Sequence, residues 1–556
     1  MRRWLLLWLL TPVLALAGPA RPGAIACATA HPLATEACLE LLRAGGNAVD
    51  AAVAASAAIA VVEPTGSGIG GGGFWLLRRA EDGQERFVDG RETAPLAAHA
   101  RMYLDAEGRA VAKASRDGAL AAAIPGEPAA LDHLARRYGR LGLARALQPA
   151  IRYAREGFAC DDKLAEAFAR HWPRLNPAAR AVFAVEGRAP RTGERLVQTD
   201  LARTLERLAA EGAAGFYQGP TAEALLRAVS AGGGVWSAED LRRYRVVERE
   251  PLVFHFREHR IVSAPPPSAG GITLAQTLGQ LELMGVTGFG AVESRHRVIE
   301  ALRRAYRDRA RWLGDPDFVR IPQAALTGRD YLRELSASIR ADAATRSESL
   351  PPAAPWREGS DTTHLSVLDA EGGRVAATLS INLPFGSGFL AEGTGVLLND
   401  EMDDFAASTE ASNAYGLIGS QANLIAAGKR PLSSMTPTFV EGPRGLLVIG
   451  TPGGSRIITM VLLGLLHWIE GASVAEVVAL PRYHHQYLPD GVQYEPAAFD
   501  DATRERLTAL GHRLQAVPDG YGNLQALHWD PQRGVVEAAS DPRGVGAARV
   551  ERLAPR

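Results

Sequence analysis

Residues 357–382 read REGSDTTHLSVLDAEGGRVAATLSIN, and this stretch decides the fold of the chain. The apolar run around residues 366–368 predicts one strand, and residues 374–382 predict a second strand with alternating side chains. Between them, residues 369–373 contain two glycines, which suit the positive φ angles of a tight turn. The stretch therefore predicts an antiparallel β-hairpin.

The register of this hairpin follows from its turn. A turn centred on Glu371 places Thr362 opposite Ser380, with Asn382 one step further along the same face. A Thr-Thr pair before a strand is often only a turn cap, but a buried group of hydroxyls needs partners or a purpose. The hairpin end that holds Thr362, Thr363, Ser380 and Asn382 is therefore a candidate site.

Composition places the chain among ordinary globular proteins. Of its 556 residues, 47% are hydrophobic and 22% are charged, which excludes disordered, collagen-like and multi-span membrane proteins. The formal net charge of −1 provides no overall field for nucleic acid or for an anionic membrane. Helical spacing dominates residues 128–350, and short strands dominate after residue 361, so we expect an α+β layered fold.

A glycine-rich run at residues 66–73 formally contains the G-x-G-x-x-G pattern of dinucleotide sites. That motif needs a strand before it and a helix after it. Here an apolar stretch typical of a buried helix, residues 49–62, precedes the glycines, and a strand-like FWLLRR follows them. We therefore expect a backbone that approaches another packed element or a ligand closely, rather than a nucleotide site.

The N-terminus reads as a secretory signal peptide at residues 1–17. Arg2 and Arg3 precede an apolar stretch, and residues 15–17 form an A-x-A cleavage site. The apolar stretch is short and broken for a membrane span, so no stable membrane anchor is expected. This pattern predicts a mature chain that begins near Gly18 and a periplasmic or secreted location.

The cysteines and histidines give weaker patterns. Cys27, Cys38 and Cys160 are an odd, low number, so we expect small buried side chains, with a Cys27–Cys38 bridge as the alternative. His364 and the neighbouring His484 and His485 show no metal-binding spacing. We therefore expect neither a metal nor another cofactor.

Motifs along almost the whole chain, about residues 24–545, resemble the γ-glutamyltranspeptidase family (glutathione hydrolases). In chain order they are HPLATEACLELLRAGGNAVDAAVA, VVEPTGSGIGGGGF, DGRETAP, PPPSAGGI, DTTHLSV, LLNDEMDDF, GKRPLSSMTP, TPGGSRII and PRYHHQ. The resemblance implies an N-terminal nucleophile hydrolase with a four-layer αββα sandwich.

The same resemblance implies that the chain cuts itself between Asp361 and Thr362. The products would be a large subunit, residues 18–361, and a small one, residues 362–556, which together form one heterodimer. Thr362 would then be the nucleophile, with its new α-amine as the base. Thr363, Ser380 and Asn382 would orient it, and the Gly453 and Gly454 amides would bind the oxyanion.

The implied substrates are glutathione and other γ-glutamyl compounds, with water or an amino acid or dipeptide as acceptor. Arg91, Ser433 and Ser434 would bind the substrate carboxylate, and Glu401 and Asp404 would bind its ammonium. Residues 406–429 would form a lid with Tyr415 as its gating residue.

Two alternatives remain beside this interpretation. A cephalosporin-acylase-like amide hydrolase could use the same scaffold, although glutaryl side chains lack the ammonium that Glu401 and Asp404 would bind. An unprocessed binding protein with an inactive site is the second. Whether the chain is found cut, and whether Thr362→Ala stops the cut, distinguishes an enzyme from a binding protein.

Overall fold

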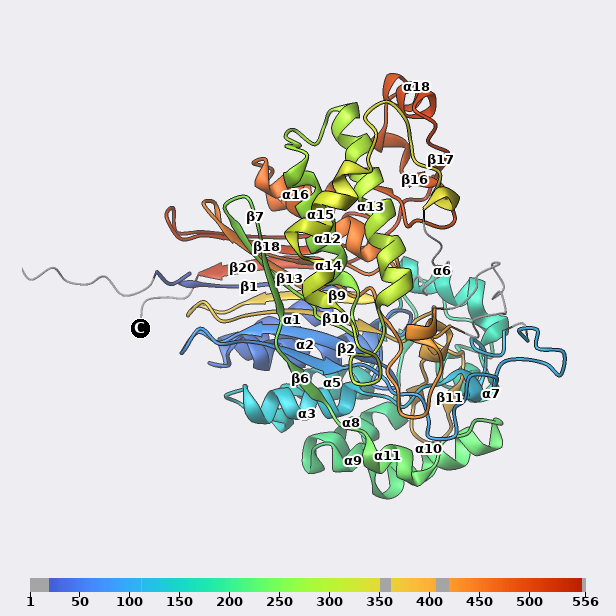
Figure 1. Ribbon diagram of the computed structural model, residues 1–556. Coiled ribbons are helices and arrows are strands. Elements are labelled where there is room, and N and C mark those ends of the chain that lie inside the picture. Colours follow the sequence, from blue (N-terminus) through green and yellow to red (C-terminus); the bar gives the residue numbers. More distant parts are fainter. Residues whose placement is uncertain (1–19, 112, 351–361, 407–419, 553–556) are drawn as a thin grey trace, which may run out of the picture.

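The computed structural model describes residues 20–111, 113–350, 362–406 and 420–552 (Figure 1). The predicted signal peptide, Asp361 and Tyr415 lie outside the described residues. None of the helices within the described ranges is both long enough and apolar enough to cross a bilayer.

Two antiparallel sheets form the centre of the molecule. The first has seven strands in the order β20 (Ala547–Arg552), β1 (Ala24–Thr29), β9 (Thr363–Leu368), β10 (Arg374–Ser380), β2 (Gly72–Arg78), β3 (Glu85–Gly90) and β6 (Val247–Arg249). The second has six, in the order β19 (Val535–Ser540), β18 (Gln525–Asp530), β14 (Gly445–Gly450), β13 (Thr438–Gly442), β8 (His259–Ser263) and β7 (Leu252–Phe256).

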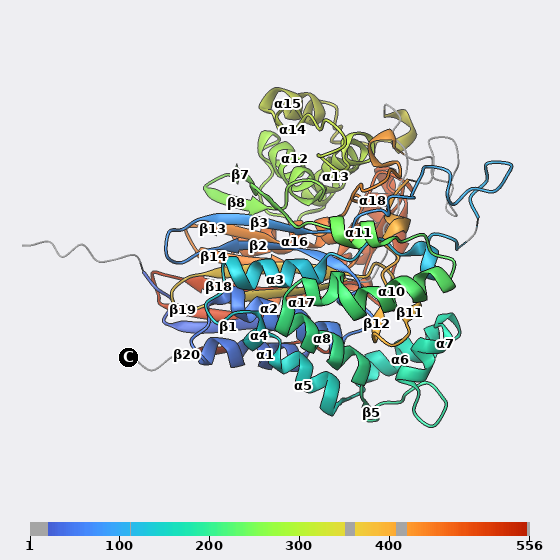
Figure 2. The same ribbon diagram turned by 90° about the horizontal axis from the view of Figure 1, so that it is seen from below.

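Helices cover the outer face of each sheet (Figure 2). On the first sheet lie α1 (Pro32–Arg43), α2 (Ala48–Val62), α3 (Glu127–Arg137), α4 (Leu143–Ala146), α5 (Gln148–Glu156) and α8 (Thr199–Glu211). On the second lie α12 (Gly270–Leu283), α13 (Val292–Trp312), α14 (Gln323–Leu326), α15 (Arg329–Ala337), α16 (Arg456–Ile469) and α17 (Val474–Ala479). The predicted four-layer αββα sandwich is confirmed.

Smaller elements lie around these layers. The helices are α6 (Asp162–His171), α7 (Pro177–Phe183), α9 (Ala214–Tyr217), α10 (Gly219–Ala231), α11 (Ala238–Arg243) and α18 (Asp501–Ala509). The short strands are β4 (Phe158–Ala159), β5 (Arg195–Leu196), β11 (Leu390–Ala391), β12 (Val396–Leu397), β15 (Tyr483–His484), β16 (Val492–Tyr494) and β17 (Leu514–Ala516).

The β9–β10 hairpin has the predicted register. Leu368 pairs with Arg374 at the turn, and Thr363 pairs with Leu379 at the open end. The next pair in this register is Thr362 with Ser380. Both strands are buried on both faces, because β9 and β10 are central strands between a helix layer and the second sheet. The hairpin end is therefore fixed on all sides.

The glycine-rich run lets the backbone of β2 approach this hairpin end. A Cβ added at Gly71 would lie 2.2 Å from the Ser380 carbonyl oxygen, and one at Gly70 would lie 1.9 Å from that of Leu397. At Gly66 the nearest atom would be the Thr362 carbonyl oxygen, at 3.2 Å. The prediction of close backbone approach is confirmed, and the partner is packed protein around Thr362 and Ser380.

The expectation that Cys27 and Cys38 are separate buried thiols is wrong, because the structure joins them in a disulfide. Cys27 lies on β1 and Cys38 on α1. Only a short turn separates the two elements, so α1 folds back directly onto β1. Their Cα atoms are thereby 6.5 Å apart, within the range of a disulfide. Cys160 is a buried free thiol, as expected.

Strands from the two sides of the predicted cleavage position alternate within the first sheet. β1, β2, β3 and β6 come from the chain before residue 361, and β9, β10 and β20 come from the chain after it. β9 pairs with β1, and β10 pairs with β2. The two parts of the chain therefore share one sheet and do not form separate domains.

Candidate active site

Thr362 and its predicted neighbours meet at the open end of the β9–β10 hairpin. The Thr362 and Ser380 hydroxyl oxygens are 3.4 Å apart, and the Asn382 backbone amide donates to Ser380 Oγ over 2.8 Å. The Asn382 side chain donates to the Asp400 carbonyl oxygen over 3.0 Å. Asn382 has a φ of 75°, a left-handed conformation that Asn tolerates better than most residues. The cluster is thus a fixed and almost fully buried group of hydroxyls.

Thr363 points away from this hydroxyl pair, because successive side chains of a strand alternate. Its hydroxyl donates to Glu63 Oε2 over 2.7 Å. Glu63 directly follows helix α2, where that helix leads into the glycine-rich run. Sequence reasoning missed Glu63, although it lies inside the quoted motif VVEPTGSGIGGGGF. Glu63 therefore joins the candidate site as the residue that holds Thr363.

Arg91 lies at the centre of a buried group of acids and is itself 1% exposed. Its guanidinium nitrogens lie 2.9 Å from Glu401 Oε1, 2.5 Å from Asp404 Oδ2 and 3.5 Å from Glu92 Oε2. Glu92 is the chain neighbour of Arg91, whereas Asp404 lies 313 residues after Arg91, so two loops far apart in sequence form this cluster. The structure thus brings the predicted carboxylate-binding and ammonium-binding residues into direct contact.

Burial dominates the ionisation of this acid cluster. It raises the pKa of Glu401 and of Glu92 to about 8, although the Arg91 cation opposes the shift. The pKa of Asp404 is also raised, by burial and by the neighbouring Glu401. Three acids thus face one guanidinium in a medium that disfavours net charge. Burial therefore favours the protonated form of these acids, and the positive charge of Arg91 opposes it.

The acid cluster adjoins the nucleophile cluster. Asp400, whose carbonyl oxygen accepts from Asn382, directly precedes Glu401 in the short 3₁₀ turn at Glu401–Asp404. Ser380 also lies beside Glu401, where its hydroxyl opposes the rise that burial causes in the pKa of that carboxyl. Ser380 and Asn382, which were predicted to orient the nucleophile, therefore adjoin Glu401, which was predicted to bind the substrate, whereas Thr363 faces Glu63.

Ser433 and Ser434 lie on the loop that Arg91 also holds. Arg91 donates to the Pro431 and Leu432 carbonyl oxygens over 3.3 and 3.2 Å. Ser433 Oγ accepts from the Met435 amide over 3.1 Å, and Ser434 Oγ accepts from Arg309 over 2.9 Å. Both serines are buried and directly follow the two residues that Arg91 holds, and their binding of a substrate carboxylate stays a prediction.

Gly453 and Gly454 lie between β14 and the start of α16. Their φ angles of 135° and 57° belong to the region that favours glycine, and a Cβ on Gly453 would lie 2.6 Å from the Met460 methyl group. The following helix α16 is 14 residues long, so its N-terminus adds a partial positive charge to this loop. The loop is therefore suited to binding an anion.

A cavity of about 1380 Å³ lies beside the hairpin end. Its wall includes Glu63, which binds Thr363, and Leu383, which follows Asn382 in the chain. Helix α6 supplies another part of the wall, including Lys163. The cavity is large enough for a dipeptide-sized ligand, although Thr362, Ser380, Asn382 and Arg91 are not among its lining residues.

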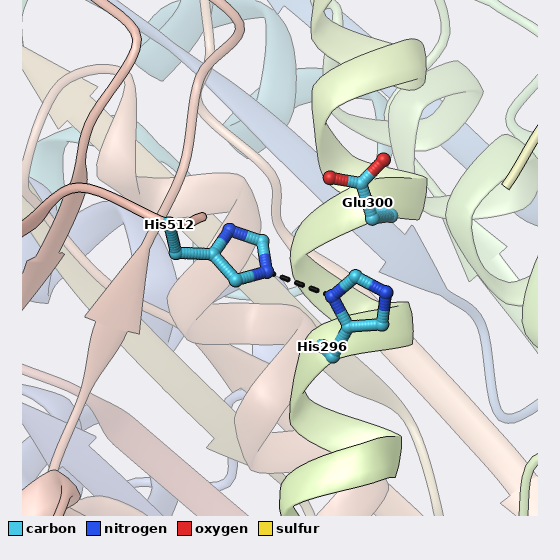
Figure 3. Close-up of side chains that lie close together, drawn as sticks. All are labelled: His296, Glu300 and His512. Carbon is cyan, nitrogen blue, oxygen red and sulfur yellow. Dashed lines mark hydrogen bonds between the residues drawn. The ribbon is translucent and has the colours of Figure 1, made fainter. Parts of the chain in front are cut away.

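A separate group, His296, Glu300 and His512, has the residue types of a metal site (Figure 3). His296 Nδ1 lies 2.8 Å from His512 Nε2, and its other nitrogen lies 2.7 Å from the Arg340 carbonyl oxygen. Glu300 accepts from Arg304 over 2.8 Å, so a cation already neutralises it. These contacts support a structural role, in which the group ties α13 to the C-terminal part of the chain.

The chain is similar to known proteins along almost its whole length. The family model described as Gamma-glutamyltranspeptidase matches residues 34–550. A glutathione hydrolase proenzyme of Pseudomonas sp. (strain A14) is 42% identical over 506 residues, which cover 90% of this chain and 88% of the relative. The glutathione hydrolase proenzyme of Escherichia coli (strain K12) is 40% identical over 521 residues, covering 92% and 89%.

A solved structure gives the same picture of the fold. The crystal structure of cephalosporin acylase from Bacillus halodurans superposes with a TM-score of 0.83 over 95% of this chain and 96% of that one, at 28% sequence identity. The acylase is thus closely similar in architecture and less similar in sequence than the two glutathione hydrolase proenzymes.

Proposed function

This chain belongs to the γ-glutamyltranspeptidase family, and on that premise we propose that it is a self-cleaving proenzyme that transfers γ-glutamyl groups from glutathione and related compounds. The observation that carries the proposal is the junction of two clusters. The Thr362–Ser380–Asn382 group supplies a nucleophile, and the adjoining group around Arg91 combines one cation with several acids.

The first step is the cut before Thr362. The Thr362 hydroxyl oxygen attacks the Asp361 carbonyl carbon, the peptide nitrogen leaves as the new α-amine, and an ester links the two residues. Water then hydrolyses this ester, which gives the Asp361 carboxylate and restores the Thr362 hydroxyl. The result is a heterodimer of residues 18–361 and 362–556.

Catalysis follows from the new N-terminus. A free α-amine titrates near neutral pH, so it can take the proton of the Thr362 hydroxyl as the oxygen attacks the γ-carbonyl carbon of the substrate. Ser380 and Asn382 hold the nucleophile in place, and the Gly453 and Gly454 amides receive the developing oxyanion. The amine product leaves, and water or an amino acid or dipeptide takes the γ-glutamyl group from the Thr362 ester.

The charged end of the substrate replaces the ion pairs that Arg91 makes with Glu401 and Asp404. Its α-carboxylate takes the place of the acids on Arg91, with Ser433 and Ser434 as further donors. Its ammonium takes the place of Arg91 on Glu401 and Asp404. A ligand with only one of the two charges would leave a buried partner uncompensated, which is costly. The site therefore selects the zwitterionic end of a γ-glutamyl group.

The cavity beside Glu63 is the space for the other half of the substrate. Its wall includes Glu63, which binds Thr363, and Leu383, which follows Asn382, and these neighbours support the placement of the leaving amine and the incoming acceptor there. That residues 406–429 would form a lid gated by Tyr415 stays a prediction from the family resemblance, because Tyr415 lies outside the described residues. The chain is exported by residues 1–17, and the Cys27–Cys38 disulfide fits an oxidising compartment.

Ionisation of the acid cluster should make substrate binding depend on pH. Below pH 8 Glu401 carries a proton in the free enzyme, because its pKa is about 8, and a bound ammonium favours the ionised form. Binding then releases a proton, so KM for a γ-glutamyl donor is expected to fall as pH rises towards about 8, by up to about tenfold per pH unit for each proton released. Glu401→Gln should reduce the slope of log KM against pH by about one. A slope identical in both proteins would contradict this assignment.

The activity is tested with two substrates that share one leaving group. The purified enzyme is expected to cleave γ-glutamyl-p-nitroanilide with a kcat/KM at least about 100-fold above that for glutaryl-p-nitroanilide, which lacks only the ammonium. The reverse preference would identify a cephalosporin-acylase-like amide hydrolase instead. Turnover of neither, with an uncut chain, would indicate an inactive binding protein.

A further inference from the structure

Asp400 makes hydrogen bonds to three consecutive residues around Asn382. Its backbone amide donates to the Ile381 carbonyl oxygen over 3.3 Å, and its carbonyl oxygen accepts from Asn382 Nδ2 over 3.0 Å. Its side-chain oxygen Oδ1 accepts from the Leu383 amide, also over 3.0 Å. The Asp400 side chain is fully buried, so water does not compete for this last contact. The backbone is therefore held on both sides of Asn382.

Asn382 in turn contacts the nucleophile pair. Its backbone amide donates to Ser380 Oγ over 2.8 Å, and that oxygen lies 3.4 Å from Thr362 Oγ. The φ of 75° at Asn382 is unfavourable for a residue with a side chain, so it persists only where neighbouring contacts hold it. The bond from the Leu383 amide to Asp400 Oδ1 is such a contact on the following residue.

We propose that Asp400 is a positioning residue for the nucleophile, acting through Asn382 and Ser380. Its Oδ1 atom fixes the Leu383 amide, and thereby the turn that directs the Asn382 amide at Ser380 Oγ. This inference rests on the proposed function, because it assumes that Thr362 is the nucleophile. It adds to that function a residue whose side chain holds the backbone of the site and does not touch the substrate.

This role requires an acceptor oxygen and not a negative charge. Burial raises the pKa of the Asp400 carboxyl, although the Arg174 guanidinium, with Nη2 4.0 Å from Oδ2, opposes the rise. A carboxyl group in either protonation state, or the side-chain amide of Asn, offers an oxygen to the Leu383 N–H. Asp400→Asn should therefore keep the contact, and Asp400→Ala should remove it.

The test compares kcat and KM for γ-glutamyl-p-nitroanilide in these two variants, with the cut fraction of each preparation measured by intact mass. Asp400→Ala is expected to lower kcat per cut enzyme about tenfold and to change KM less than about twofold, because it loosens the nucleophile and keeps the side chains that bind the substrate. Asp400→Asn should recover kcat to within about twofold of wild type.

A double variant shows whether Asp400 acts through Ser380. In a Ser380→Ala background, Asp400→Ala should lower kcat less than about twofold, because the group that the Asn382 amide holds is already absent. A general loss of packing would not depend on Ser380 in this way.

Asp369→Ala is the matched control. Asp369 is also a buried acid that accepts from backbone amides, those of Ala48, Glu371 and Gly373, but it lies at the turn end of the same hairpin. It should leave kcat within about twofold, whatever stability it costs. If Asp400→Ala fails to fold or to cut itself, Asp400→Ser replaces it. The serine oxygen is one bond closer to the backbone than Asp Oδ1, and about a threefold fall in kcat is expected.

Five results would overturn the inference. These are an unchanged kcat in Asp400→Ala or Asp400→Ser, a loss in Asp400→Asn equal to that in Asp400→Ala, an equal fall in kcat with and without Ser380, an equal fall in Asp369→Ala, or a rise in KM at constant kcat. A wild-type enzyme without γ-glutamyl turnover would instead overturn the proposed function, so the two failures are distinguishable.

Discussion

Replacing Thr362 by Ala is expected to leave the purified protein as one uncut chain, with γ-glutamyl transfer at least about 1,000-fold below wild type. The substitution removes the only atom that can attack the Asp361 carbonyl carbon in the proposed cut. It also removes the nucleophile of the transfer reaction. Intact mass of the denatured protein reports the cut, and release of p-nitroaniline from the γ-glutamyl anilide reports the activity.

Thr362→Ser is the control for this experiment, because it keeps the attacking oxygen and removes only a methyl group. It should still give two fragments, the smaller beginning at residue 362, although more slowly. Two fragments from Thr362→Ala would place the cut under the control of another residue. One uncut mass for the wild-type protein after long incubation would remove the catalytic assignment altogether.

Replacing Asp404 by Asn is expected to raise KM for γ-glutamyl substrates about 100-fold or more, because it removes a buried charge that would pair with the substrate ammonium. Self-cleavage should slow far less, since the Asp361–Thr362 bond presents no ammonium to the acid cluster. The measurement is KM from steady-state kinetics, together with the time course of cutting followed by intact mass.

Asp403→Asn provides the matched comparison. Asp403 is the adjacent residue, but it accepts hydrogen bonds from Ser115 and Arg116 and does not contact Arg91. Its replacement should leave KM within a few-fold of wild type, as expected for a partly exposed ion pair. Equal damage to substrate binding and to cutting in Asp404→Asn would contradict the ammonium-binding role.

The sequence was most informative where structure is local. The register of the hairpin follows from a short turn, so Thr362 and Ser380 could be paired from the sequence alone. The glycine-rich run indicated a close backbone approach, and context excluded a nucleotide site. The grouping of Arg91 with Asp404 came from the family resemblance, since no local pattern links residues 313 positions apart.

Contacts that depend on how layers pack could not be predicted. The Cys27–Cys38 disulfide requires that α1 fold back onto β1, and a strand followed by a helix does not specify that angle. Arg309 is one of several arginines of α13, and its spacing does not reveal that it is buried, as Arg303 and Arg304 also are. Glu63 stood inside a recognised motif, but its contact with Thr363 appears only once α2 packs against the hairpin.

The alternation of strands in the first sheet has a consequence for when the chain could be cut. The hairpin end at Thr362 takes its surroundings from the other side of the proposed cut, because β9 pairs with β1, β10 pairs with β2 and Thr363 binds Glu63. If the proposed cut needs these surroundings, it would take place in a molecule that has already folded, and the two fragments would already be paired. After such a cut, the unfolded protein could refold only when the two fragments meet, so its refolding rate would depend on the fragment concentration. The proposed cut would thus turn refolding of one chain into the joint folding of two fragments that share one sheet.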